Sequence, residues 1–174
     1  MTGKTFLNSV INGEIDIIEL LLTLLEETGC AYCVIGGLAV NAYAEPVVSL
    51  DLDVVVVLDR IDTLRKGAKD KGMNVQEFEH SVNLSVKGSD LRIQLQTDPR
   101  YQDFILRSKV LEVLGYEIAV ACIEDVLRGK IWAYSDNTRR KSKRQKDLSD
   151  IMRLVETHPE LESKLPPEIA AQLE

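Results

Sequence analysis

The chain has 174 residues, of which 21 are Lys or Arg and 28 are Asp or Glu, and 45% of its residues are hydrophobic. A chain of this length can bury a sizeable core without a metal or disulfides, so we expect a single domain over 1–174, with its core at about 15–121 and C-terminal helices at about 123–174. The net charge of −7 excludes a protein that coats nucleic acid through overall basicity.

Helical and alternating spacings of apolar side chains divide the chain into elements. In chain order, the sequence predicts a helix over 15–28, a strand over 31–35, a short helix over 38–44, a strand over 50–58, a helix over 61–71, strands over 81–86, 91–96 and 116–121, helices over 123–135 and 143–156, and a last short helix from 166. The strands over 81–86 and 91–96 are predicted to form a hairpin. This succession indicates an α/β or α+β fold, in which a mixed β-sheet is flanked by helices and followed by a C-terminal helical pair.

The strand over 50–58, LDLDVVVVL, is the most distinctive segment. Its second half is continuously β-branched, which indicates a strand in the interior of a sheet. Asp51 and Asp53 lie two residues apart, so both carboxylates point to one face of the strand. The pair can bind a divalent cation, or it can simply be solvated at an exposed strand end. If it is buried, a cation or a basic partner is expected nearby, because an unpaired buried carboxylate is costly.

A glycine pair precedes this strand. Gly36 and Gly37 end the strand over 31–35 and open a helix. Glycines at such a turn let backbone N–H groups approach a phosphate, which the positive end of the helix also favours, although the same pair can form a plain tight turn. Together with the two aspartates, the pair predicts a phosphate site beside a magnesium site, since Mg²⁺ prefers carboxylates and phosphates as ligands.

Positive charge is concentrated in one segment. Residues 128–146 hold eight basic side chains and one acid, which leaves 13 basic and 27 acidic residues in the rest of the chain. The segment can be a solvated loop and helix start, or it can contact RNA or an acidic protein.

Three cysteines, an odd number, fit a reducing compartment. Cys30 and Cys33 form a C-x-x-C pair that could build a zinc site with Cys122, His80 and His158, but we interpret all three cysteines as small core residues. The apolar runs are shorter than the roughly 20 residues of a membrane-spanning helix. The N-terminus lacks the pattern of a secretory signal. We therefore expect a cytoplasmic protein that does not contact membranes.

The order of these motifs resembles the nucleotidyltransferase superfamily. Its signature is a Gly-Gly or Gly-Ser turn followed by Asp-x-Asp on the next strand, as in Gly36-Gly37 and 49–53 here. The chain is most similar to small bacterial members related to the abortive-infection nucleotidyltransferase toxins. In these proteins a helical lysine, here Lys130, precedes a basic stretch that ends in Lys-Asp-x-x-Asp, here 146–150. The resemblance spans roughly 31–155 and implies a minimal nucleotidyltransferase core that binds a nucleoside triphosphate (NTP).

The resemblance also implies a role for each matching residue. Gly36, Gly37, Ser49 and Lys130 would bind the nucleotide, Asp51 and Asp53 would bind Mg²⁺ or Mn²⁺, and Asp51, Asp53, Lys130 and Asp147 would be catalytic, with Asp147 orienting the lysine or an acceptor. Without the resemblance, Lys130 reads as a solvated helix lysine, and Asp147 and Asp150 read as an i, i+3 pair in an exposed helical turn.

Two positions depart from the family pattern. Relatives usually carry a third carboxylate on a later strand, where this chain has Gln94, and Glu79 or Asp98 could replace it only from elsewhere in space. An amide cannot supply the charge that supports a second cation, nor act as a base. Val47 stands where many relatives have a basic residue, while Ser49 keeps the small hydroxyl position.

Two hypotheses about function share this fold. In the first, the protein binds Mg–NTP and transfers a nucleoside monophosphate to an RNA or protein acceptor. In the second, it is a nucleotide-binding or interaction module of the same fold that has lost turnover. A paired antitoxin or toxin protein is a further expected partner in either case.

Overall fold

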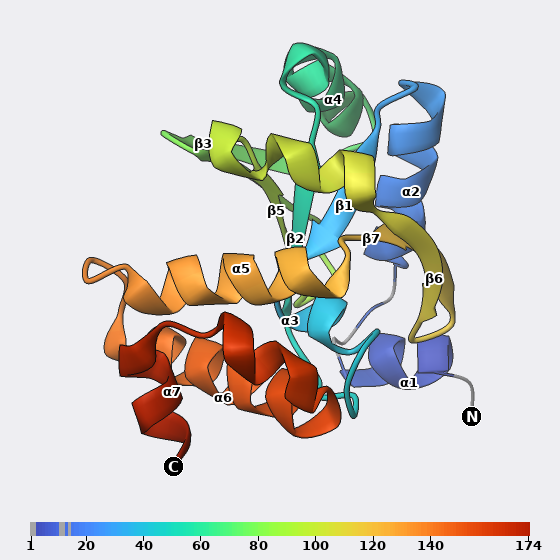
Figure 1. The fold of residues 1–174 in the computed structure, drawn as a ribbon. Coiled ribbons are helices and arrows are strands. Elements are labelled where there is room, and N and C mark those ends of the chain that lie inside the picture. Colours follow the sequence, from blue (N-terminus) through green and yellow to red (C-terminus); the bar gives the residue numbers. More distant parts are fainter. Residues whose placement is uncertain (1–2, 11–12, 14) are drawn as a thin grey trace.

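The computed structural model describes residues 3–10, 13 and 15–174. In this part of the chain, seven strands form one mixed sheet in the order β3-β4-β5-β2-β1-β7-β6 (Figure 1). The strands are β1 (Tyr32–Ile35), β2 (Asp51–Val56), β3 (Asn74–Phe78), β4 (Ser81–Ser85), β5 (Arg92–Gln96), β6 (Lys109–Val113) and β7 (Tyr116–Val120). The α-helices are α1 (Gly3–Val10), α2 (Ile17–Glu27), α3 (Gly36–Val40), α4 (Ile61–Asp70), α5 (Ile123–Ser135), α6 (Lys141–Thr157) and α7 (Pro167–Leu173). Short 3-10 helices are η1 (Leu58–Arg60), η2 (Pro99–Arg107) and η3 (Pro159–Lys164). The predicted mixed α/β architecture is confirmed.

β2 lies in the interior of the sheet, as its β-branched sequence predicts. It pairs antiparallel with β1 and parallel with β5. Val54, Val55 and Val56 are fully buried, because side chains on both faces of this strand are covered. The register places Ile35 opposite Asp53, so the chain leaves β1 and enters α3 directly beside the second aspartate.

The two strands that the sequence missed, β3 and β6, lie at the edges of the sheet. β3 is the outer strand at one edge, and four of its five residues are exposed. β6 is the outer strand at the other edge, with only Val113 buried. An edge strand is stabilised by pairing with its inner neighbour rather than by burial, so its sequence need not alternate. The sequence also places the short helix after Gly37, whereas α3 already begins at Gly36.

The C-terminal helices lie together at one end of the molecule, below the sheet in Figure 1. α5 is attached to η2 by two kinds of contact. Asp125, which is buried on α5, accepts two hydrogen bonds from the guanidinium group of Arg107 at the end of η2. The rings of Phe104 and Trp132 stack with centroids 5.7 Å apart. These contacts hold α5 over the sheet, because both the charge and the aromatic area would be lost if it moved.

The positions of the cysteines and the lengths of the helices can be compared with the expectations from the sequence. Cys30 and Cys33 are buried in the core, whereas Cys122 is half-buried at the N-cap of α5. Among the described residues, none of the helices is long and apolar enough to span a bilayer.

Candidate functional site

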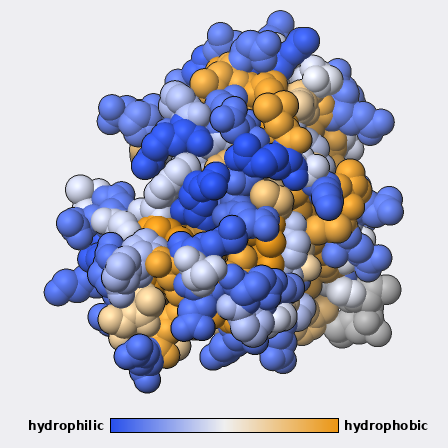
Figure 2. Space-filling model, in the orientation of Figure 1, coloured by the Kyte–Doolittle hydropathy of each residue, from blue (hydrophilic) through white to orange (hydrophobic). Residues whose placement is uncertain are grey.

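A cavity of about 280 Å³ lies between the sheet and the helices α5 and α6. Five of the predicted binding and catalytic residues line it: Gly36, Asp51, Asp53, Lys130 and Asp147. Figure 2 shows mainly hydrophilic residues on the surface where η2 and α5 face one another. The fold therefore brings residues that are far apart in the sequence to one polar recess.

Gly36 lies so close to Asp53 that a larger residue would displace the Asp53 side chain. A Cβ atom at this position would lie 2.4 Å from Oδ2 of Asp53. The φ angle of Gly36 is +73°, in the left-handed region that favours glycine. Because both constraints act on the same residue, the turn between β1 and α3 requires a glycine here.

The carboxylate of Asp51 is paired with two cations. Lys143 Nζ donates a hydrogen bond to Oδ2 at 2.8 Å, and Arg92 Nη2 lies 2.9 Å from Oδ1. Arg92 reaches Asp51 because the two residues are register partners on the parallel strands β2 and β5. Partial burial opposes ionisation, but the hydrogen bond from Lys143 and the positive charges around it outweigh this and hold the pKa of Asp51 below its ordinary value.

The second aspartate has a different environment. In the described part of the chain, the carboxylate of Asp53 has no hydrogen bond or ion pair. Burial raises its pKa above the ordinary value, the charge of Lys130 opposes this rise, and the neighbouring charge of Asp51 adds to it. Asp53 is therefore a carboxylate at the cavity whose charge the surrounding side chains compensate only in part.

Lys130 joins α5 to α6 through buried charges. Its Nζ lies 2.9 Å from Oδ1 of Asp147 and 2.7 Å from Oδ2 of Asp150, and all three residues are at most 6% exposed. Desolvation lowers the pKa of Lys130, but the charges of Asp150 and Asp147 outweigh it and raise the pKa overall. The interpretations of Lys130 as a solvated lysine and of the aspartates as an exposed pair are therefore wrong, because the helix face that carries them packs inward.

Arg139 and Arg153 complete this network from its two sides. Arg139 Nε donates to Oδ2 of Asp147 at 2.7 Å, and Arg153 Nη1 donates to Oδ1 of Asp150 at 2.8 Å. Each buried aspartate therefore has Lys130 and one arginine as partners. The network fixes the Lys130 ammonium group at the cavity wall.

An uncharged row of side chains continues from Asp53 across the sheet. Gln94 on β5 is the register partner of Asp53, and Asn83 on β4 is the register partner of Gln94. All three line the cavity. Oδ1 of Asn83 is buried and accepts no hydrogen bond within the described residues. Gln94 lines the cavity, whereas neither Glu79 nor Asp98 is among its lining residues.

Gly37 and Ser49 are not among the residues that line the cavity. A Cβ atom at Gly37 would be at ordinary contact distance, 3.7 Å, from Oγ of Ser49. Ser49 is buried, and its Oγ accepts hydrogen bonds from Lys146 Nζ at 3.3 Å and from the backbone N–H of Asp51 at 3.3 Å. In this structure Ser49 supports the first residue of β2.

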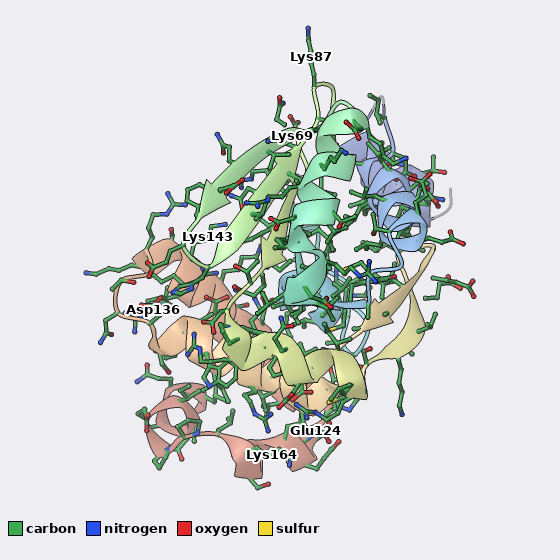
Figure 3. All side chains as sticks on the ribbon, turned by 90° about the horizontal axis from the view of Figure 1, so that it is seen from above. Lys69, Lys87, Glu124, Asp136, Lys143 and Lys164 are labelled. Carbon is green, nitrogen blue, oxygen red and sulfur yellow. The ribbon has the colours of Figure 1, made fainter. Side chains whose placement is uncertain are left out.

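Apart from Lys130, the sequence did not single out the cations of the site. Arg92, Arg139 and Lys143 all line the cavity. The spacing of Arg92, two residues before Gln94 on the same strand face, could have indicated its position. Arg139 and Lys143 belong to the basic segment 128–146, but only the packing of α6 shows which of its charges face the cavity. Figure 3 shows Lys143 where the C-terminal helices meet the sheet, and Asp136 away from it at the turn between α5 and α6.

Comparisons by sequence find no relative: no family model matches the chain, and no curated protein matches it. Solved structures do match. One is ANT(2″)-Ia in complex with adenylyl-2″-tobramycin, with a TM-score of 0.61, 15% identity, and coverage of 90% of this chain and 92% of the other. Another is the lincosamide antibiotic adenylyltransferase LnuA, with a TM-score of 0.57, 11% identity, and coverage of 82% and 99%.

A third matching structure is a nucleotidyltransferase-like protein from Paracoccidioides brasiliensis, with a TM-score of 0.56, 18% identity, and coverage of 96% of this chain and 85% of the other. The chain therefore has the nucleotidyltransferase fold, as the resemblance of its motifs implies. The narrower similarity to the abortive-infection toxins stays a prediction.

Proposed function

We propose that the protein binds an NTP together with Mg²⁺ in this cavity and transfers a nucleoside monophosphate to a hydroxyl group of an RNA or protein acceptor. The observation that carries the proposal is the incomplete charge compensation of Asp53, which lies against the Gly36 turn with cationic side chains nearby. A bound divalent cation would supply the missing positive charge.

The side chains present fit a magnesium ion. Asp51 and Asp53 supply carboxylate oxygens, and Gln94 can supply an amide oxygen, all of which are ligand types that Mg²⁺ accepts. In the described residues no group of three or more Asp, Glu, His or Cys side chains forms a metal cluster. The donor set therefore suits one ion that is completed by phosphate oxygens better than two ions held by protein alone. When bound, Mg²⁺ would stabilise the negative charge that develops on the transferred phosphoryl group.

We assign the triphosphate and the acceptor to opposite sides of the cavity. Gly36, Lys130 and Lys143 line the cavity. We expect the Gly36 turn to allow close approach of a phosphate on the β1 side of β2, and the two lysines to neutralise the triphosphate. In-line displacement places the leaving pyrophosphate and the attacking hydroxyl on opposite sides of the reacting phosphorus. The acceptor would then approach from the β5 side, where Asn83 Oδ1 offers an unused acceptor to a hydroxyl.

A nucleotide-binding module without turnover is the second candidate. Gln94 favours it, because no carboxylate stands there to accept the proton of an acceptor hydroxyl. The variant Gln94→Asp discriminates between the two candidates. Transfer by the wild type supports the enzyme, whereas transfer by Gln94→Asp alone marks a protein that has lost turnover.

Self-labelling with each of the four α-³²P-labelled NTPs in Mg²⁺, with and without added tRNA, tests transfer directly. We expect label on the protein or the tRNA with at least one NTP, and loss of label in Asp53→Asn. If the wild type and Gln94→Asp both bind nucleotide yet label nothing, the transfer reaction is refuted and nucleotide binding remains. We further propose a cytoplasmic location. We also propose a paired antitoxin or toxin protein as a partner, which co-purification from the native host would test.

A further inference from the structure

The two aspartates of β2 differ in how their negative charges are compensated. Asp51 has a cation on each oxygen: Lys143 on Oδ2 at 2.8 Å and Arg92 on Oδ1 at 2.9 Å. The two cations come from different elements, the first turn of α6 and the strand β5. Asp53 has no such partner within the described residues. One of the two expected metal ligands is therefore already occupied by the protein's own cations.

The two cations also differ in their surroundings. The Lys143 side chain is 31% exposed and carries its charge on a flexible four-carbon chain, so it can turn from one anion to another at little cost. Arg92 stands directly opposite Asp51 in the sheet register, and its side chain is 64% exposed. A triphosphate in the cavity would compete with Asp51 for Lys143, because it offers several anionic oxygens at once.

We infer that Lys143 masks the metal-binding oxygen of Asp51, so that a divalent cation binds tightly only when nucleotide phosphates draw Lys143 away. This inference rests on the proposed nucleotide site and names the residue that couples nucleotide to metal there. Masking also neutralises Asp51 while the cavity is empty, which limits repulsion between the two aspartates. By thermodynamic reciprocity, the metal then favours the nucleotide by the same factor as the nucleotide favours the metal.

Binding of Mn²⁺ alone, measured by electron paramagnetic resonance of the free ion without nucleotide, tests the inference. We expect weak binding to the wild type and at least tenfold tighter binding to Lys143→Met, whose methionine keeps the length of the side chain without its charge. The gain should disappear in the double variant Lys143→Met/Asp51→Asn. Lys141→Met is the matched control: Lys141 is exposed in the same helical turn, does not line the cavity, and should leave Mn²⁺ binding unchanged.

Binding of ATP in EDTA, measured by calorimetry on the same variants, separates the two proposals. We expect metal-free ATP to bind the wild type at least tenfold more tightly than Lys143→Met. Equal Mn²⁺ affinity of the wild type, Lys143→Met and a second unmasked variant, Arg92→Met, would overturn the inference, provided circular dichroism shows that all three are folded. A gain of Mn²⁺ binding in Lys143→Met, with no nucleotide bound by any protein, would support masking and refute the proposed nucleotide site.

Discussion

Asp51 and Asp53 are separated by one residue, yet their pKa values shift in opposite directions. Burial raises the pKa of Asp53, whereas Lys143 and Arg92 overcome partial burial and lower the pKa of Asp51. A carboxyl group whose pKa is lowered by folding stabilises the folded state at pH values above its unfolded pKa. This stabilisation is lost as pH falls through the folded pKa. A raised one destabilises the folded state as pH rises through the interval between the two values.

We therefore expect amide substitutions at these two positions to have opposite effects on stability. At pH 7, Asp53→Asn should raise the free energy of unfolding by roughly 1 kcal/mol, and Asp51→Asn should lower it by a similar amount, because it leaves two cations without a partner. The Asp53 difference should shrink as pH falls toward the ordinary carboxyl pKa of 3.8, whereas the Asp51 difference should be largely kept at pH 4 and lost only at lower pH, through the folded pKa of Asp51. Urea unfolding at pH 7 and pH 4 measures them, and shifts of the same sign at pH 7 would contradict this assignment.

Gly36 and Gly29 allow backbone strain to be separated from the contact with Asp53. Both have positive φ angles, +73° and +59°, but a Cβ atom at Gly29 would meet no atom within 4 Å. Gly29→Ala should therefore cost only the left-handed conformation, about 1–2 kcal/mol. Gly36→Ala should cost clearly more and should also weaken nucleotide binding, because Asp53 must move. Equal losses of unfolding free energy in the two variants would show that the contact is unimportant.

At the scale of elements, α5 and α6 are joined by a buried charge network rather than by apolar contact alone. Lys130 on α5 lies between Asp147 and Asp150 on α6. We expect Lys130→Met to lower the free energy of unfolding by about 3–5 kcal/mol, because it leaves two buried carboxylates short of a partner. Arg144→Met is the control on α6, where the partly buried side chain contacts the backbone carbonyl of Tyr134. A Lys130→Met variant as stable as Arg144→Met would refute a structural role for the network.

The sequence predicts elements better than it predicts the contacts between them. The β-branched run of β2 and the apolar spacing of α2 indicate from the local sequence that these elements are buried. Both elements can therefore be predicted. Gly36, Asp51 and Asp53 are identifiable because their spacing on adjoining elements already implies one site. The pairing of Lys143 with Asp51, 92 residues apart in the chain, depends on how α6 packs against the sheet, and no local pattern records it.

At the scale of the whole molecule, the basic segment 128–146 is less available to partners than its composition suggests. Six of its eight basic side chains have internal partners: Arg128, Lys130, Arg139, Lys143, Arg144 and Lys146. Arg140 and Lys141 are exposed and have no such contact within the described residues. Most of the positive charge in this segment is therefore paired within the protein, at the cavity and between helices, rather than free to bind a partner at the surface.

The salt dependence of tRNA binding tests whether only the two unpaired basic side chains of this segment are available to bind RNA. If only Arg140 and Lys141 contribute from this segment, the logarithm of the association constant should fall with the logarithm of salt concentration with a slope of roughly −2. The double variant Arg140→Gln/Lys141→Gln should abolish most of this dependence in a filter-binding titration. A slope several times steeper, unchanged in the double variant, would mean that the paired residues also bind RNA.

Calorimetric titration of the protein with each of the four NTPs in Mg²⁺ tests the central claim, that the cavity between the sheet and α5–α6 is a nucleotide site. We expect at least one NTP to bind with a stoichiometry of one. Asp53→Asn and Gly36→Ala should weaken that binding at least tenfold, and Lys141→Met should leave it unchanged. If none of the four NTPs binds the folded wild type, or if binding is the same in Asp53→Asn as in the wild type, the cavity is not the nucleotide site proposed here.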